Sequence, residues 1–259
     1  SIWPDAYYLT ANKGGANKVY AIERDVILAG DPDPQIIGFP LPGNTENQNT
    51  VLSPEPANLT GVDYPEDLPG YIVYLQDDGW GGITYDHLKV WEIDVDFNSP
   101  ANSTISSPLE IPIDPFNAYF APFGSGDVAQ PGTGQKIDMI TGLISYAANY
   151  RSFDNHNSWL ITFNDNIDGT NSGIRWIELR NDDTNPWEVF QEGTYSPADD
   201  NSRFMGSAAM DAAGNIGMGF NIASATLPAG IRYTGRYDSD PLGEMTIAET
   251  TIVDGVGVQ

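Results

Sequence analysis

The chain has 259 residues and contains no cysteine. This absence excludes structural disulfides, thiolate catalysis and cysteine-based zinc sites. Only two histidines are present, His87 and His156, so a histidine-based zinc site would need carboxylate ligands as well. No apolar run reaches the roughly 18 residues that a membrane-spanning helix requires. We therefore predict no membrane span.

Basic residues are also scarce. The chain has 36 Asp and Glu residues against 11 Lys and Arg residues, which gives a formal net charge of -25. So negative a surface repels the phosphate backbone of nucleic acids, and we expect no nucleic-acid partner. The same acidity is compatible with calcium binding and with solubility in salty water, where screening shortens the reach of charge repulsion.

Helical periodicity is nearly absent. The 19 prolines and 27 glycines interrupt almost every stretch, and no long window keeps an apolar period of 3.6 residues. One short helical turn is predicted from Val26 to Ala29. Short β-branched and aromatic runs, bounded by Gly, Asn, Asp and Pro, predict strands instead. The fold class is therefore all-β.

A hairpin pattern returns four times along the chain. Each occurrence has a strand-like run, a polar turn and a second run of the form hydrophobic–aromatic–x–hydrophobic. The predicted strand pairs are residues 7–9 with 19–22, 72–75 with 90–93, 159–161 with 175–179, and 218–220 with 231–234. Repeated β units of this kind are typical of a β-propeller, of which about four blades would be visible here.

The repeats predict a single domain over residues 1–259. Its approximate units are residues 1–41, 71–113, 136–196 and 201–259, separated by long connectors at 42–70 and 114–135. The chain opens at Ser1 and stops at Gln259 inside β-like sequence. We therefore expect a processed form or a segment of a longer precursor, with further segments completing the propeller.

Two acidic loops are candidate calcium sites. Residues 164–169 begin like an EF-hand loop, but the twelfth position is Arg175 instead of the bidentate Glu. The alternatives are a simple hairpin loop or a different calcium site formed by Asp165, Asn166 and Asp168. Asp77 and Asp78 form a second loop, either a plain turn or a contact to calcium or sugar.

One short segment could carry catalysis. Arg151, Asp154 and His156 lie within six residues, and a histidine oriented by an aspartate can act as a general base. The alternative is a structural hydrogen-bond network. The nucleophile motif G-x-S-x-G is absent, so the sequence predicts no serine triad.

Ligand contacts are predicted from Arg and Trp residues. Arginine clusters bind substrate carboxylates, and the candidates here are Arg151, Arg175, Arg203, Arg232 and Arg236, although the sialidase signature F/Y-R-I-P is absent. Trp3, Trp80 and Trp187 occur in loop-like sequence. They could stack on sugar rings, or they could pack in the core or at its rim.

Several longer motifs resemble a known group of proteins. They are residues 3–8 (WPDAYY), 131–138 (PGTGQKID), 173–180 (GIRWIELR), 193–197 (GTYSP), 203–211 (RFMGSAAMD), 231–236 (IRYTGR) and 240–243 (DPLG). They resemble large secreted β-propeller proteins, BNR or sialidase-like, of Gram-negative and often marine bacteria. The resemblance implies a secreted or cell-surface location, adhesion or sorting domains elsewhere in the precursor, and no established catalytic residues.

These observations predict a non-catalytic binding, adhesion or structural module that is stabilised by calcium and recognises a polysaccharide or a protein partner. Two alternatives stay open. One is a glycan-active hydrolase or lyase that works through carboxylates and the group of Arg151, Asp154 and His156. The other is a subunit of a larger extracellular assembly, whose open strand edges pair with another chain.

Overall fold

The computed structural model describes residues 1–12, 16–43, 53–65, 67–118, 120, 127–182 and 184–258. Parts of both predicted connectors and Gln259 lie outside these residues. The described chain consists of β-strands and turns, with one α-helix, α1 (Arg24–Leu28), and one 3₁₀ turn (Pro100–Asn102). The all-β class is thus confirmed, and α1 overlaps the helical turn predicted at 26–29.

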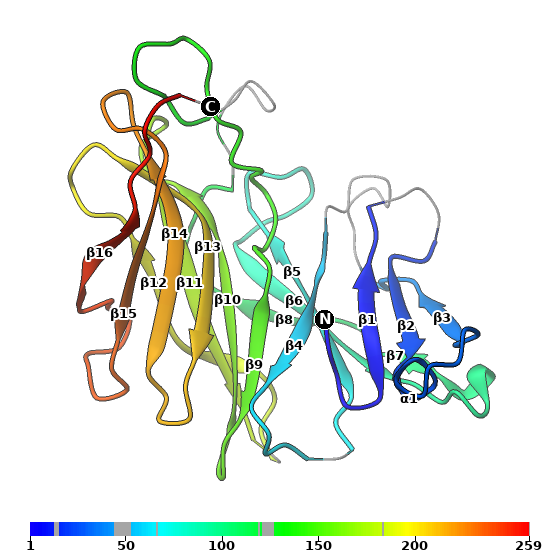
Figure 1. Ribbon diagram of the computed structural model, residues 1–259. Helices are drawn as coiled ribbons and strands as arrows, with labels where there is room; N and C mark the ends of the chain where they lie inside the picture. The colour runs from blue at the N-terminus through cyan, green and yellow to red at the C-terminus, as the bar shows by residue number, and fades with distance from the viewer. Residues whose placement is uncertain are drawn as a thin grey trace.

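The strands form three sheets (Figure 1). The first has the order β1 (Ala6–Thr10), β2 (Val19–Glu23), β3 (Ile36–Phe39). The last has the order β13 (Ser202–Met210), β14 (Ile216–Ala223), β15 (Gly230–Arg236), β16 (Ile247–Val253). The central sheet runs β12 (Glu188–Tyr195), β11 (Ser172–Asn181), β10 (Asn157–Asn166), β9 (Ala148–Ser152), β4 (Glu55–Thr60), β5 (Gly70–Gln76), β6 (His87–Asp94), β7 (Thr104–Ile105), with β8 (Leu109–Pro112) also paired to β6.

All four predicted hairpins are confirmed. Their central antiparallel pairs are Tyr8 with Ala21, Ile72 with Trp91, Ile161 with Ile177, and Phe220 with Arg232. A tight turn at residues 211–215 joins β13 to β14. There the Asp211 side chain accepts the backbone N–H groups of Ala213 and Asn215, and Gly214 takes a φ of 84°. Aspartate and glycine are the residues that such a turn requires.

The connector predicted at residues 42–70 contains a strand. In β4, Glu55 and Pro56 pair antiparallel with β5, whereas residues 57–60 pair in parallel with β9. The second and third predicted units therefore share one continuous sheet. A sequence pattern of hairpins does not reveal such a join, because the parallel partner of β4 begins 91 residues further along the chain, at Ala148 opposite Ala57.

Of three buried hydrophobic clusters, two hold the sheets together, and the third packs Phe120, Val128 and Met139 on β13 and β14. The larger one includes a cluster of aromatic rings from Trp3, Tyr71, Tyr150, Trp159 and Trp187, with ring centroids of 4.9 to 6.2 Å in the contacting pairs. The second core lies where β10 and β11 pack on the last sheet. Residues 158–165 are buried without interruption, because β10 has a core on each of its faces.

No helix among the described residues is long and apolar enough to cross a membrane.

Candidate functional site

The hairpin between β5 and β6 brings three aspartates together. Asp77 directly follows β5, Asp86 directly precedes β6, and Asp78 lies in the loop between them. One carboxylate oxygen of each lies within 4.8 Å of the others. Asp77 and Asp86 are buried, while Asp78 is exposed to solvent. Sequence reasoning named Asp77 and Asp78 but missed Asp86, which enters the cluster only because β5 and β6 pair.

Backbone amides hold two of these carboxylates in place. Asp77 accepts the N–H groups of Gly79 and Ala118, both at 2.6 Å. Asp86 accepts those of Asp78 at 2.7 Å and Phe116 at 2.8 Å. The cluster therefore fastens the β5–β6 hairpin to the segment around residues 116–118.

The cluster concentrates negative charge in a poorly solvated place. Burial raises the pKa of Asp77, the amides of Ala118 and Gly79 oppose this, and the negative charges of Asp86 and Asp78 raise the pKa further. Carboxylate oxygens are the ligands that calcium prefers, and each oxygen that accepts one N–H keeps a second lone pair. The three residues could thus hold a metal ion, with access from the side of Asp78.

Trp80 lies in the same loop. Its backbone N–H bonds to the carbonyl of Asp77 at 3.0 Å, and its ring packs on Tyr74 with 6.2 Å between the centroids. Trp80 is half-buried and follows Asp78 by two residues. The predicted ligand contact at Trp80 remains a prediction.

The second predicted calcium loop is held together by its own hydrogen bonds. Asp165 points inward and accepts the Asn117 amide and the Thr194 hydroxyl. Asp168 is exposed and accepts the amides of Thr170 and Asn171, which lower its pKa. The two carboxylates thus serve separate hydrogen-bond networks. A calcium site formed by Asp165, Asn166 and Asp168 stays a prediction.

Arg151, Asp154 and His156 line one hollow of about 510 Å³, together with Asp63 and Tyr64. Among the described residues, however, the hydrogen-bond partner of His156 Nδ1 is Asn155 Oδ1 at 2.8 Å, and Asp154 is exposed. Burial and the nearby Arg180 charge lower the pKa of His156. The predicted residues share a site, but the aspartate does not orient the histidine there.

Arg203 was predicted to contact a ligand, and the structure corrects this. The side chain is 1% exposed. It donates to both carboxylate oxygens of Asp199, at 2.9 and 2.8 Å, and to Glu249 at 2.6 Å. Burial opposes its charge, but these hydrogen bonds and charges outweigh that effect and raise the pKa of Arg203. Its guanidinium is engaged inside the fold.

The other predicted cluster arginines are also engaged. Arg175 pairs with Glu192, Arg232 with Asp254, and Arg236 donates to the carbonyl of Asp240. Arg151 donates to the carbonyl of Met210 at 3.4 Å and lies apart from these three in the hollow described above. Each arginine thus has its own partner within the fold.

Trp187 was also predicted to contact a ligand, and this prediction is wrong. It is 3% exposed and lies within the aromatic cluster of the larger core, as does Trp3. A ring that is packed on both sides offers no face to a sugar. The flanking Asn, Pro and Glu residues suggested a loop, whereas tertiary packing buries the indole.

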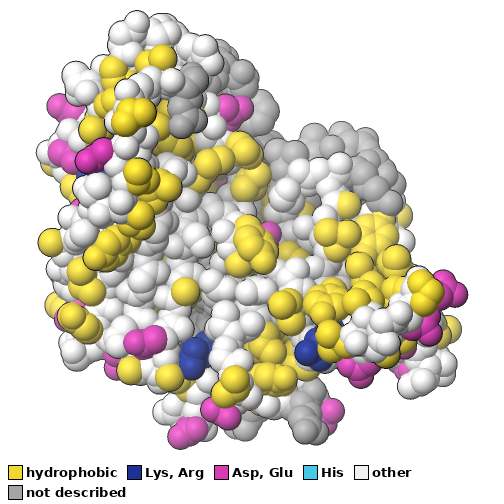
Figure 2. Space-filling model, viewed as in Figure 1, with side chains coloured by type: hydrophobic (Ala, Val, Ile, Leu, Met, Phe, Trp, Pro, Cys, Tyr) yellow, Lys and Arg dark blue, Asp and Glu magenta, His cyan; other side chains and the backbone are white. Residues whose placement is uncertain are grey.

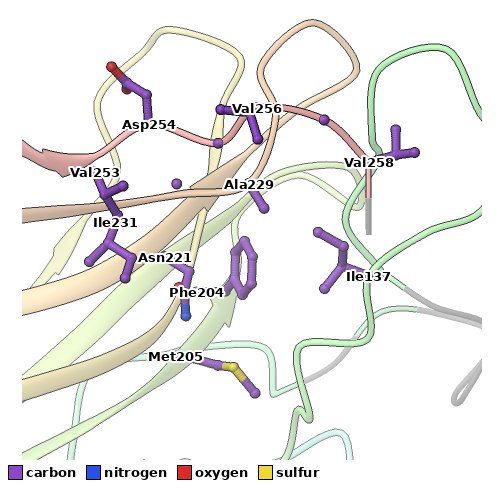
Figure 3. A pocket seen from close by; sticks show the side chains of 13 residues that line it. Ile137, Phe204, Met205, Asn221, Ala229, Ile231, Val253, Asp254, Val256 and Val258 are labelled. Atoms are coloured by element: carbon purple, nitrogen blue, oxygen red, sulfur yellow. The ribbon is translucent and has the colours of Figure 1, made fainter.

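Two further hollows carry no residue predicted as a site. One, of about 630 Å³, has four acidic residues among those that line it: Asp5, Asp67, Glu92 and Asp94. The other, of about 520 Å³, lies where β16 ends and has apolar walls that include Ile137, Phe204, Ile231 and Val253 (Figure 3). Neither was visible in the sequence, because its residues come from distant segments.

No protein-family model matches the chain, and no curated protein sequence matches it. The resemblance to secreted β-propeller proteins therefore remains an expectation that rests on the motifs quoted above.

Proposed function

We propose that the chain is a non-catalytic binding or structural module of a secreted or cell-surface protein, stabilised by calcium. The observation that carries the proposal is the buried cluster of Asp77, Asp78 and Asp86. We further propose that the four hairpins, each with its neighbouring antiparallel strands, are blades of a β-propeller, complete or part of a larger one.

Calcium would compensate the charge of the cluster and strengthen a junction of the fold. Asp77 and Asp86 link the β5–β6 hairpin to the amides of Ala118 and Phe116. Mutual repulsion of the carboxylates weakens this link, and a divalent cation would remove the repulsion. Binding to the folded state alone raises stability by mass action.

A polysaccharide or a protein partner is the proposed ligand. Trp80 supports this choice, since a half-buried indole next to acidic groups offers both an apolar face and hydrogen-bond acceptors. The high negative charge supports an extracellular setting in which salt screens repulsion.

The test of the calcium site is a titration of the protein with Ca²⁺, with Mg²⁺ as comparison. We expect binding heat and a rise in Tm with Ca²⁺, and at least an approximately tenfold weaker affinity in Asp78→Asn. Asp78 is exposed, so its substitution should leave the fold intact. Asp33→Asn, at another exposed aspartate, is the matched control. A wild-type protein with neither heat nor a change in Tm would refute the calcium site.

A second candidate function is glycan hydrolysis or elimination. It is favoured by the hollow that brings Arg151, Asp154 and His156 together, with Tyr64 beside them. His156 Nε2 has no hydrogen-bond partner within the described structure and could take up a proton. Release of reducing ends from acidic polysaccharides, lost in His156→Gln but kept in His87→Gln, would support this candidate over the first.

A further inference from the structure

Strand β16 forms an open edge of the last sheet. Its neighbour on one side is β15, and no other described strand pairs with its second side. In Figure 1 it lies at the outer margin of the molecule. A row of unpaired backbone N–H and C=O groups of this kind is a template for another strand.

Three other strands at sheet edges are protected. The loop at Gly243 covers β12. The Gly243 N–H donates to Gln191 Oε1 at 3.2 Å. The backbones also lie close together, since a Cβ added to Gly193 would lie 2.3 Å from the Gly243 carbonyl oxygen. Strand β8 has only four residues and ends in proline, and β3 has four residues and is followed by Pro40. Short edges and prolines are common devices against strand pairing.

β16 carries neither of these two devices, although its pairing with β15 shifts register at two places, between Ile231 and Arg232 and between Tyr233 and Gly235. Its seven residues, Ile-Ala-Glu-Thr-Thr-Ile-Val, include no proline and no lysine. Ile252 is 59% exposed and Val253 is 49% exposed. Apolar side chains reach the surface on this side of the molecule, as Figure 2 shows. An exposed apolar edge of this length without proline or lysine offers a surface for a partner strand.

The edge is electrically balanced, although the whole chain has a net charge of -25. Glu249 is the single charged residue of β16, and Arg203 pairs with it. The next charged residue, Asp254, pairs with Arg232 at 2.6 Å. This is a strip of the surface along which a second, equally acidic copy could approach without placing unpaired carboxylates against each other.

We propose that β16 pairs antiparallel with β16 of a second copy and so joins two four-stranded sheets into one. The sequence of β16 is self-complementary about Thr250. In this register Thr250 faces itself, Ala248 faces Ile252, Ile247 faces Val253, and Glu249 faces Thr251. No like charges stand opposite each other, and Thr–Thr and aliphatic pairs stabilise antiparallel sheets. A two-fold axis through Thr250 closes the assembly as a dimer.

The proposal rests on the β16 edge and is independent of the calcium site. It extends the third alternative that the sequence left open, a subunit whose strand edges pair with another chain. The proposal adds the partner, a second copy, and the register of the pairing. Failure of one proposal would leave the other untouched, because Asp77, Asp78 and Asp86 lie in a different sheet.

A single cysteine tests the two-fold axis, since the chain has no cysteine of its own. Directly opposed residues of an antiparallel pair have Cα atoms roughly 4.5–5.5 Å apart, which suits a disulfide. We expect Thr250→Cys to form a disulfide-linked dimer at least about tenfold faster than Thr170→Cys, because the dimer raises the effective concentration of the thiols. Thr170 is also an exposed threonine and lies in the turn between β10 and β11. Equal rates for the two variants would overturn the proposal.

A charge exchange tests the register. Ala248 and Ile252 are both exposed, so charged residues are compatible with the fold there. Ala248→Glu combined with Ile252→Glu would place two pairs of like charges across the interface and abolish the dimer in sedimentation experiments. Ala248→Lys combined with Ile252→Glu would create two pairs of opposite charges and restore the dimer. A dimer that survives the double glutamate variant would overturn the register.

Salt provides the third readout. Two copies of charge -25 repel each other over a distance that shrinks from roughly 10 Å at 0.1 M salt to roughly 3 Å at 1 M. We therefore expect the dimer fraction of the wild-type chain to rise between 0.1 and about 1 M NaCl. A chain that stays monomeric at every salt and protein concentration tested would overturn the proposal, and it would assign the edge to a different partner.

Discussion

Arg203 Nε donates to Glu249 Oε2 at 2.6 Å, although their strands, β13 and β16, form the opposite edges of one four-stranded sheet. The two side chains can reach each other only if the sheet curls strongly. Tyr195 of β12 also donates to Glu249, and its ring lies near the guanidinium, with 5.7 Å between Arg203 Cζ and the centroid. The ion pair therefore stabilises both the curl of the last sheet and its packing on the central one.

We predict that Glu249→Gln destabilises the fold by about 3 kcal/mol, because it leaves a buried guanidinium with one charged partner fewer. Urea denaturation measures the loss. Glu244→Gln, at an exposed glutamate just before β16, should stay within about 0.5 kcal/mol of the wild type. Equal stability of the two variants would show that Asp199 alone satisfies Arg203.

Gly193 is predicted to be intolerant of a side chain. A Cβ at this position would lie 2.3 Å from the backbone oxygen of Gly243, and backbone cannot move aside easily. Gly193→Ala should cost about 1–3 kcal/mol through overpacking. Gly217→Ala is the control, since nothing lies within 4 Å of an added Cβ there. A thermal melt of both variants measures the difference, and a neutral Gly193→Ala would mean that the Gly243 loop yields.

Stability should fall as the pH rises from about 4.5 to about 7, in part because of Glu55. Burial raises the pKa of Glu55 to about 7, against the opposing effects of the Ser1 ammonium group and the Ala148 amide. The folded state then binds the proton more tightly than the unfolded state. The stabilisation by protonated Glu55 is complete below about pH 4.5, the pKa of the unfolded state. It is lost as the pH rises through about 7, the pKa of Glu55 in the folded state.

Glu55→Gln should remove this part of the pH dependence, which is on the order of 3 kcal/mol. Denaturation at pH 4.5 and pH 7.5 measures it, and exposed Glu188→Gln should retain the slope of the wild type. An unchanged slope in Glu55→Gln would place the origin of the pH dependence elsewhere.

Trp187→Ala should cost about 3–5 kcal/mol, as expected for a large side chain removed from a core. Trp80→Ala should cost clearly less, because its ring is half-buried and packs at the edge of that core. Chemical denaturation of the two variants provides the comparison. Near-equal losses would contradict the assignment of Trp187 to the core and Trp80 to the rim.

The hairpins were predictable because their information is local. A strand, a turn and a second strand lie within about 20 residues, and alternation of apolar side chains marks both strands. The turn at Asp211 was predictable for the same reason. The parallel pairing of β4 with β9 was not, because nothing near residues 55–60 specifies a partner that begins at Ala148.

The candidate site was predictable only in part. Asp77 and Asp78 stand out in the sequence as a loop signal, but Asp86 joins them through the pairing of β5 with β6. Trp187 was misassigned because its flanking residues resemble a loop, and Arg203 because arginine clusters can bind carboxylates. Burial, however, depends on which sheets pack over a residue.

By itself, the amino-acid sequence determined the all-β class, the four hairpins, the acidity and the absence of thiol chemistry, since composition and local periodicity encode these properties. Only the tertiary structure decided how the hairpins join, which carboxylates cluster and which strand edge stays open. These features arise from contacts between segments far apart in the chain, where burial, charge compensation and strand pairing depend on the whole fold.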